Sequence, residues 1–349
     1  MWSEEVQSAR EDLKSIKPEE EVILQPLDKR IPSWDFSRFE ERGCPICETE
    51  NFDSSYIRPD KCSVLRCSNC SCLYVSPAPS EDLINEFYST YHDTHFGGST
   101  NKIIEDIKSE LDRAAPQSDL RIKFLHNDML VKNSPSYRVL DYGCGTGSFL
   151  YQAQRLGASV SGIEIDKSAV LVCHKLGLDS VILGGADALE TLDTKYDLIV
   201  LNDVIEHPLN PNYLISILSD LLSENGKILI WTPNGNAIDN DDSKTTLRVD
   251  LEHMQYLTSG AVAELCRRNN LAVWHYHQLG IPSEKNFISN AAEKSSTSKI
   301  KSGLIFCLRM LGLKYVARNL LARLRFKLHS PHQSDGNYHL FCVLIKQNQ

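Results

Sequence analysis

The sequence has no run of apolar residues that approaches the ~20 needed to span a bilayer. Its first residues, MWSEEVQSAREDLKSIKPEEE, lack the basic start and the apolar stretch of a secretory signal. The apolar share of 42% and the charged share of 24% are typical of globular proteins. We therefore expect a soluble cytoplasmic protein, and 349 residues allow two compact units or one large unit with an appendage.

An overall excess of positive charge is also missing. The formal net charge of −9 argues against a protein that binds nucleic acid mainly by neutralising phosphates, and we find no strong nucleic-acid signal. The exception is local, because residues 294–334 contain nine Lys or Arg residues and no Asp or Glu. An amphipathic basic helix over 299–329 would suit peripheral contact with the inner face of a membrane. We favour a lid over the sheet or a dimer contact, and the oligomeric state stays open.

Cysteine is abundant and unevenly placed. Six of the eleven cysteines lie between Cys44 and Cys72, and four of them form the pattern C-x2-C-x19-C-x2-C. Such spacing is typical of a tetrahedral structural zinc site, here with Cys44, Cys47, Cys67 and Cys70 as ligands. Four thiolates leave no open coordination position, so the predicted role is to stabilise a small zinc ribbon. Cys62 or Cys72 could replace one of the four ligands.

Changes in composition divide the chain into five segments. We expect an N-terminal extension over 1–40 and the zinc ribbon over 41–80, which ends in the proline-rich run SPAPS. A helical linker or lid follows over 81–134, with one helix from Ser80 and another stretch from Ile103 to Val131. The main domain is expected over 135–283 plus 336–349, and a basic helical insertion over 284–335 separates its last two strands.

The main domain alternates short β-rich runs with helices. The runs YRVLD, ASVSGIE, DSVIL, YDLIVLN and GKILIWT are separated by helical stretches that end at Gly157, Gly177 and Gly226. This alternation is typical of an α/β fold with a doubly wound parallel sheet. The first strand leads directly into DYGCGTGSF, a turn with Gly143, Gly145 and Gly147 at alternate positions.

A glycine-rich turn between a strand and a helix can bind a nucleotide. Glycine allows positive φ angles, and the helix N-terminus presents free N–H groups to a ligand. Ser148 stands where a dinucleotide fingerprint would have its third glycine, so the pattern is DxGxGxG instead. Glu164 ends the second strand, where a carboxylate can accept both ribose hydroxyls, and Asp187 follows the third strand near an expected adenine edge. A tight turn without a ligand is the alternative.

The run from VLDYGCGTG through GIEID, ADALE and YDLIVLNDVIEHPLNP to GKILIWTPN resembles class I S-adenosylmethionine-dependent methyltransferases. The resemblance implies a Rossmann-like, seven-stranded sheet whose last strand, YHLFCVLIK, is antiparallel. It implies S-adenosylmethionine as cofactor, with the methionyl end on the turn, the ribose at Glu164 and the adenine at Asp187. The cofactor site it implies comprises Asp141, Gly143, Gly145, Gly147, Glu164, Ile165, Asp187, Ala188, Asn202 and Asp203.

The acceptor side follows the fourth and fifth strands. His253, His207 and Tyr256 are the catalytic candidates, and His253 is our first choice as a general base. His207 could instead support the cofactor pocket, because the resemblance gives the Glu-His pair of DVIEHP mainly that role.

The ribbon and its following helix resemble the leader of bacterial sugar-modifying methyltransferases, among them C-methyltransferases of nucleotide-linked deoxysugars. We therefore expect a small-molecule or glycan acceptor, favouring a nucleotide- or lipid-linked sugar in polysaccharide biosynthesis. The alternatives are methylation of RNA or protein, with the ribbon as a recognition module, and a non-catalytic protein that uses the fold for binding.

Overall fold

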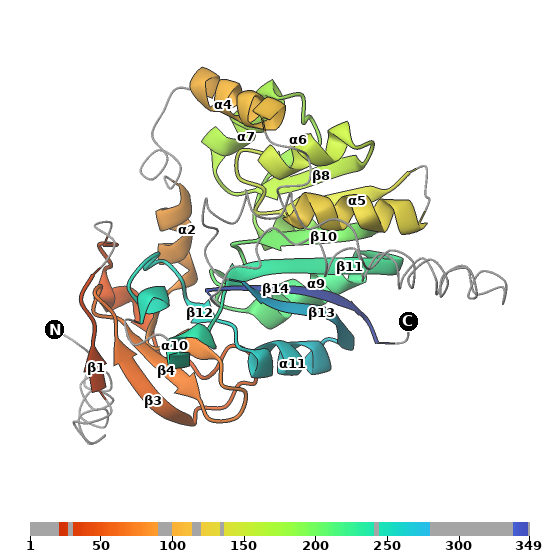
Figure 1. The fold of residues 1–349 in the computed structure, drawn as a ribbon. Helices are drawn as coiled ribbons and strands as arrows, with labels where there is room; N and C mark the ends of the chain where they lie inside the picture. Colours follow the sequence, from red (N-terminus) through yellow and green to blue (C-terminus); the bar gives the residue numbers. More distant parts are fainter. Residues whose placement is uncertain are drawn as a thin grey trace, which may run out of the picture.

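The computed structural model describes residues 21–26, 31–89, 100–113, 120–132, 136–240, 244–279 and 338–347. Within them it shows a large sheet flanked by helices and a smaller sheet beside one end of it (Figure 1). The predicted basic insertion, including 299–329, lies outside the described residues, as does most of the predicted N-terminal extension. The helix predicted from Ser80 is α2 (Glu81–Ser89), and the stretch predicted from Ile103 comprises α4 (Thr100–Arg113) and α5 (Leu120–Lys132).

The large sheet has seven strands in the order β13-β14-β11-β10-β7-β8-β9. The strands are β7 (Arg138–Tyr142), β8 (Ser159–Glu164), β9 (Val181–Leu183), β10 (Tyr196–Asn202), β11 (Leu222–Pro233), β13 (Leu271–Leu279) and β14 (His339–Lys346). Pairing is parallel from β9 through β11, while β14 is antiparallel to both β11 and β13. The predicted seven-stranded α/β sheet with an antiparallel last strand is confirmed.

Helices cover both faces of this sheet. One face packs against α4, α5, α6 (Ser148–Arg155) and α7 (Lys167–Lys175), and the other against α8 (Ala186–Leu189), α9 (Pro211–Asp220) and α11 (Ser259–Arg268). Local chemistry sets the helix ends: the side chain of Asp166 accepts two backbone N–H groups at the start of α7, and Asn210 caps α9. Gly157, with φ of 93°, follows α6.

The smaller sheet has the order β1-β3-β4-β5-β12 and draws on distant parts of the chain. Its strands are β1 (Glu21–Ile23), β3 (Phe52–Ile57), β4 (Ser63–Cys67), β5 (Leu73–Val75) and β12 (Gln255–Tyr256). A two-stranded ladder joins β2 (Phe39–Glu40) to β6 (Ala78–Pro79) beside it. The remaining elements are η1 (Phe36–Arg38), α10 (Ala237–Asn240) and η2 (Thr245–Leu247). Since β12 lies after β11 in the chain and pairs with β5 of the predicted ribbon, the small sheet contains a strand from the main domain. The segment boundaries given above stay predictions.

Two arginines join the ribbon to the main domain. Arg42 donates hydrogen bonds to the backbone oxygens of Val75, Leu209 and Met254. Arg58 is fully buried and pairs with Asp60 at 2.6 Å. Satisfying several acceptors at once offsets the cost of burying each guanidinium.

Arg58 also acts on the loop before β12. It donates to the backbone oxygens of Leu251 and His253, each at 2.5 Å. The ribbon therefore fixes the loop that carries His253.

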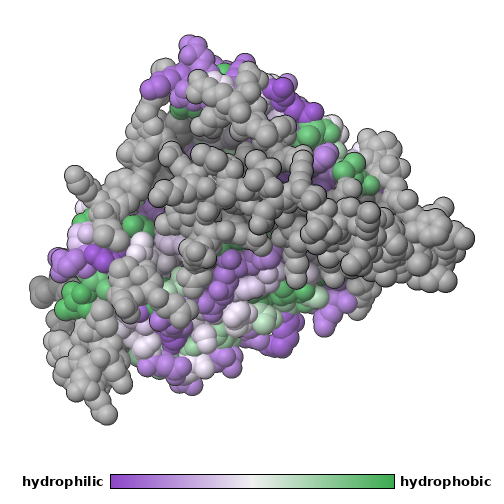
Figure 2. All heavy atoms as spheres, viewed as in Figure 1, coloured by the Kyte–Doolittle hydropathy of each residue, from purple (hydrophilic) through white to green (hydrophobic). Residues whose placement is uncertain are grey.

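The described surface is mixed in polarity. Figure 2 shows polar side chains over α4 and scattered apolar ones elsewhere among the coloured residues. Within the described residues, no helix has the length and apolar character that crossing a membrane requires.

Candidate functional site

The glycine-rich turn leaves β7 and enters α6. Gly143, Gly145 and Gly147 have φ angles of 74°, 53° and 78°, a region that other residues rarely adopt. A Cβ on Gly143 would lie 2.5 Å from a methyl group of Val204, and one on Gly147 would lie 2.6 Å from Leu178. A Cβ on Gly145 would meet nothing within 4 Å. Packing therefore accounts for Gly143 and Gly147, whereas Gly145 faces open space in which a ligand can approach the backbone.

Glu164 ties the end of β8 to this turn. Its two carboxylate oxygens accept the backbone N–H groups of Gly145 at 2.7 Å and Asp166 at 2.9 Å. Burial raises the pKa of Glu164, while these N–H groups oppose the shift. Each carboxylate oxygen can accept a further hydrogen bond. Glu164 thus fits a ligand that presents two hydroxyl groups beside the turn, as a ribose does.

The other predicted cofactor residues lie around these two. Asp141 and Asn202 belong to the carboxyl ends of the adjacent parallel strands β7 and β10. Asn202 donates to the carboxylate of Asp203 at 2.8 Å. In α8, Asp187 accepts the N–H of Gly185 at 3.1 Å, next to Ala188, and Ile165 is 38% exposed beside Glu164. The turn, the carboxylate and the flanking polar groups together fit an adenosine sulfonium.

A second group of polar side chains comes from the segment after β10 and from the loop before β12. Glu206, His207 and His253, which we call the acceptor-side cluster, offer three ligand atoms within 4.8 Å of one another. Glu206 is fully buried, and its Oε2 accepts the hydroxyl of Thr232 at 2.9 Å. Its Oε1 lies 4.0 Å from Nε2 of His253. The two imidazole rings stack edge-to-face with centroids 4.9 Å apart, and Tyr88 of α2 bonds Nδ1 of His207 at 2.5 Å.

Burial controls the charges in this cluster. It raises the pKa of Glu206 well above the ordinary carboxyl value, and the nearby carboxylate of Asp203 adds to this shift. It lowers the pKa of His253, with further lowering by His207 and Arg58. His253 is therefore neutral near pH 7.

Tyr256 contacts the cluster without joining it. The ring of Tyr256 lies 5.8 Å from that of His253, but its hydroxyl accepts a hydrogen bond from Arg58 at 3.1 Å. Burial raises the pKa of Tyr256 to about 12. The structure thus brings the three catalytic candidates together, and their chemical roles stay predictions.

The four predicted metal ligands also come together. Cys44, Cys47, Cys67 and Cys70, which we call the four-cysteine cluster, are buried, and their sulfur atoms lie within 4.8 Å of one another. The separations are 3.5 Å for Cys44 and Cys70 and 3.3 Å for Cys47 and Cys67. Sulfur atoms ~2.3 Å from a tetrahedral zinc lie ~3.8 Å apart, so the four-cysteine cluster is compatible with a structural zinc ion.

The two spare cysteines differ in their environments. Cys62 packs with the residues around Trp34 and Leu73, and its N–H donates to Asp60. Cys72 lies among the ligand cysteines in the core, where its thiol faces the backbone oxygens of Leu73 and Tyr256.

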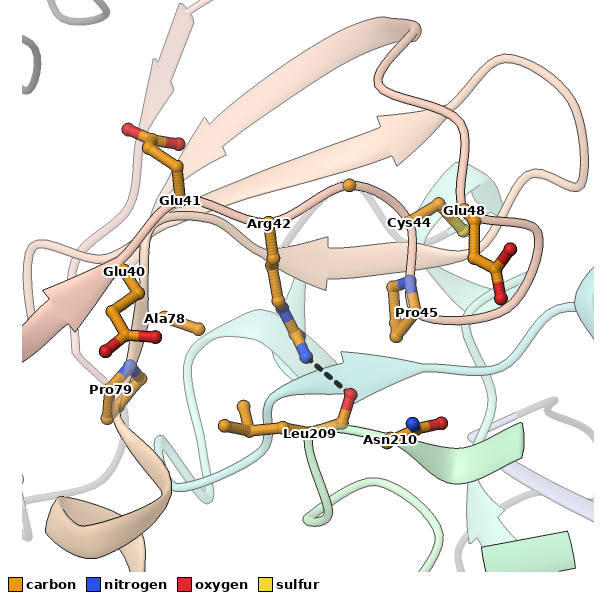
Figure 3. Close-up of a pocket in the computed structure, with 11 residues that line it drawn as sticks. Glu40, Glu41, Arg42, Cys44, Pro45, Glu48, Ala78, Pro79, Leu209 and Asn210 are labelled. Atoms are coloured by element: carbon orange, nitrogen blue, oxygen red, sulfur yellow. Dashed lines mark hydrogen bonds between the residues drawn. The ribbon is translucent and has the colours of Figure 1, made fainter. Parts of the chain in front are cut away.

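A groove with a cavity volume of about 320 Å³ lies at the seam between the ribbon and the main domain (Figure 3). Arg42 points across it toward the carbonyl of Leu209. Glu40, Glu41 and Glu48 line its rim. This groove belongs to the ribbon contact and is separate from the glycine-rich turn.

Three further residues support the acceptor-side cluster. Thr232 bonds Glu206, Tyr88 bonds His207, and Arg58 holds the backbone of His253. Thr232 could have been found from its place at the end of the fifth strand. No local sequence signal connects Arg58 with His253, because 195 positions separate them.

The chain matches a known protein family. A family model described as "Methyltransferase domain" matches residues 101–276. A ubiquinone biosynthesis O-methyltransferase of Glaesserella parasuis is 34% identical over 110 residues, covering 29% of this chain and 47% of the relative. The ribosomal protein L11 methyltransferase of Lactobacillus johnsonii is 38% identical over 96 residues, which cover 26% of this chain and 30% of the relative. The chain spans about half the length, or less, of the curated relatives it matches.

The solved structures to which this chain is similar include methyltransferases. The plantazolicin methyltransferase BamL, in complex with a triazolic desmethylPZN analog and SAH, has a TM-score of 0.43 at 20% identity, over 76% of this chain and 99% of that one. An Archaeoglobus fulgidus SAM-dependent methyltransferase has a TM-score of 0.42 at 18% identity, over 74% of this chain and 99% of that one.

Proposed function

This chain belongs to the methyltransferase-domain family, and from that premise we propose that it transfers a methyl group from S-adenosylmethionine to a small-molecule acceptor. The observation that carries the proposal is the contact between Glu164 and the N–H of Gly145. This contact holds a buried carboxylate beside a backbone turn that is open to a ligand. Neither feature is needed for a tight turn alone.

The cofactor brings a methyl group already activated on a sulfonium, so the protein has to position the two reactants. Glu164 would accept the ribose hydroxyls, the open turn at Gly145 would contact the methionyl end, and Asp187 would meet the adenine. During transfer the acceptor atom forms a bond to the methyl carbon as the carbon–sulfur bond breaks. The electron pair of that bond stays on sulfur.

We propose a hydroxyl group, on a sugar or a similar small molecule, as the acceptor. Several relatives are named O-methyltransferases, and the ribbon with its following helix resembles the leader of sugar-modifying enzymes. A hydroxyl must lose its proton during transfer, and the acceptor-side cluster supplies polar groups at the carboxyl end of β10. RNA or protein methylation is the second candidate, for which the ribbon would bind the substrate.

Thermal unfolding with S-adenosylmethionine tests the cofactor half of the proposal. A ligand at a concentration of 100 Kd stabilises the folded state by ~2.7 kcal/mol. We expect this stabilisation in the wild type and its loss in Glu164→Ala. Glu190→Ala is the matched control, because Glu190 is an exposed carboxylate that bonds Tyr213 away from the turn. No response of the wild type would contradict the proposal.

A panel of acceptors tests the other half. Nucleotide-linked sugars, lipid-linked sugars and RNA are incubated with the protein and the cofactor, and the products are examined by mass spectrometry. A methylated sugar supports the proposal, and methylated RNA alone would favour the second candidate. Cytoplasmic location and peripheral membrane contact through 299–329 also stay proposals. If the protein still binds liposomes after residues 299–329 are removed, the proposed membrane contact through that segment is contradicted.

A further inference from the structure

One buried polar atom of the acceptor-side cluster, Oε1 of Glu206, has no hydrogen-bond partner among the described residues. Glu206 is fully buried, so bulk water does not satisfy this oxygen. Buried polar atoms in native proteins are nearly always bonded, and an exception calls for an ordered water or an ion.

We propose that Glu206, His207 and His253 bind a divalent transition-metal ion, separate from the four-cysteine cluster, which holds the acceptor oxygen. The inference rests on the proposed function for its chemical role, but the metal site itself does not. In this role both histidines are ligands, which replaces our assignment of His253 as a general base.

The distance between Glu206 and His253 suits a metal ion. Ligand nitrogen and oxygen atoms lie ~2.1 Å from zinc, so two of them can be up to ~4.2 Å apart. Oε1 of Glu206 and Nε2 of His253 are 4.0 Å apart, too far for a hydrogen bond and within reach of one shared ion. His207 contributes a third atom within 4.8 Å of the others.

The surrounding groups orient the ligands. Tyr88 bonds Nδ1 of His207 and so fixes the orientation of that ring. Thr232 bonds Oε2 of Glu206, which leaves Oε1. Arg58 fixes the backbone of His253 through its carbonyl. Such outer contacts accompany most protein metal ligands and set which atom faces the ion.

The donor set selects the kind of metal. Two imidazoles and one carboxylate suit zinc, manganese, cobalt or iron(II), whereas calcium and magnesium prefer oxygen ligands alone. Three protein ligands leave at least one coordination position for another molecule. The four-cysteine cluster, with its four thiolates, leaves none. The acceptor-side cluster is therefore suited to chemistry, and the four-cysteine cluster to structure.

A metal ion here would prepare the acceptor for transfer. A hydroxyl bound to a divalent ion loses its proton to solvent water far more readily than a free hydroxyl. The oxygen then bonds the methyl carbon of S-adenosylmethionine, and S-adenosylhomocysteine leaves with the electron pair of the broken carbon–sulfur bond. No further reactant is needed.

Metal counting tests the site without any assay of methyl transfer. The full chain is dialysed against a zinc buffer and its zinc content measured by elemental analysis. We expect two zinc ions per chain in the wild type and one in Glu206→Gln. The control His275→Asn changes a buried histidine of β13 outside the cluster and should keep two. Tyr88→Phe should weaken the second ion by ~10-fold or more.

Two results would overturn the inference. One is a wild type that holds a single zinc ion when its cysteine site is full. The other is a folded Glu206→Gln protein that still holds two. If Glu206→Gln fails to fold, X-ray absorption of the zinc-loaded wild type tests the site instead. We expect the zinc ions to have both sulfur neighbours and nitrogen or oxygen neighbours. Sulfur neighbours alone would refute the site.

The two proposals can fail separately. Cofactor binding with one zinc ion leaves the methyltransferase proposal in place and removes the metal site. Two zinc ions without cofactor binding do the reverse.

Discussion

Gly145 offers a sharp test of the cofactor site, because its backbone is strained for other residues while its surroundings are empty. In Gly145→Ala the added methyl group meets no protein atom within 4 Å. The substitution therefore costs only the left-handed conformation at φ of 53°, ~1–2 kcal/mol. If the cofactor lies on this turn, the same methyl group also occupies space that the ligand needs.

Gly157→Ala is the matched control. Gly157 has φ of 93°, and a Cβ there also meets nothing within 4 Å, but the residue follows the C-terminal end of α6, whereas the turn precedes the N-terminal end of that helix. Urea unfolding should show similar losses of stability in the two variants. Isothermal titration with S-adenosylmethionine should show at least ~10-fold weaker binding, ~1.4 kcal/mol, in Gly145→Ala alone. Equal affinity in both variants would refute the placement of the cofactor.

Three further substitutions test the rest of the structure. Cys67→Ser should remove one zinc ion per chain and make the ribbon sensitive to protease, and a zinc content equal to that of the wild type would contradict a zinc site in the four-cysteine cluster. Arg58→Met leaves Asp60 buried without its partner and should lower the free energy of unfolding by ~3–5 kcal/mol in urea titrations; a loss below ~1 kcal/mol would refute that reasoning. Burial lowers the pKa of Lys123 to about 8, against ~10.4 in the unfolded chain, so Lys123→Met should be more stable than the wild type by ~1–2 kcal/mol at pH 7. Because the folded pKa is the lower one, this difference should shrink as the pH rises from ~8 to ~10.4, and a constant difference would contradict the assignment.

The sheet could be predicted because its signals are local. Alternating runs of β-branched residues and helices closed by Gly157 and Gly177 recur along the chain, and each strand pairs with a neighbour of the same design. The smaller sheet was harder to predict. β12 is two residues long, and its pairing with Leu73 and Tyr74 joins positions far apart in the sequence. Propensity carries no information about such a contact.

The candidate site also contains residues that the sequence could identify and residues that it could not. The spacing of the cysteines and of the glycines follows from metal and backbone geometry, so both groups could be named from the sequence. The contact between Glu164 and Gly145 needs only adjacent strands. The partners of His207 and His253 come instead from α2 and from the ribbon, which approach them only after folding. Arg58 was therefore beyond sequence reasoning as a support of this cluster.

Isothermal titration of the full chain with S-adenosylmethionine, in the wild type and in Glu164→Ala, tests the central claim most directly. The account predicts one binding site per chain in the wild type and at least ~30-fold weaker binding in Glu164→Ala, ~2 kcal/mol, with Glu190→Ala unchanged. Absence of binding to the wild type, or equal binding by Glu164→Ala, would contradict it.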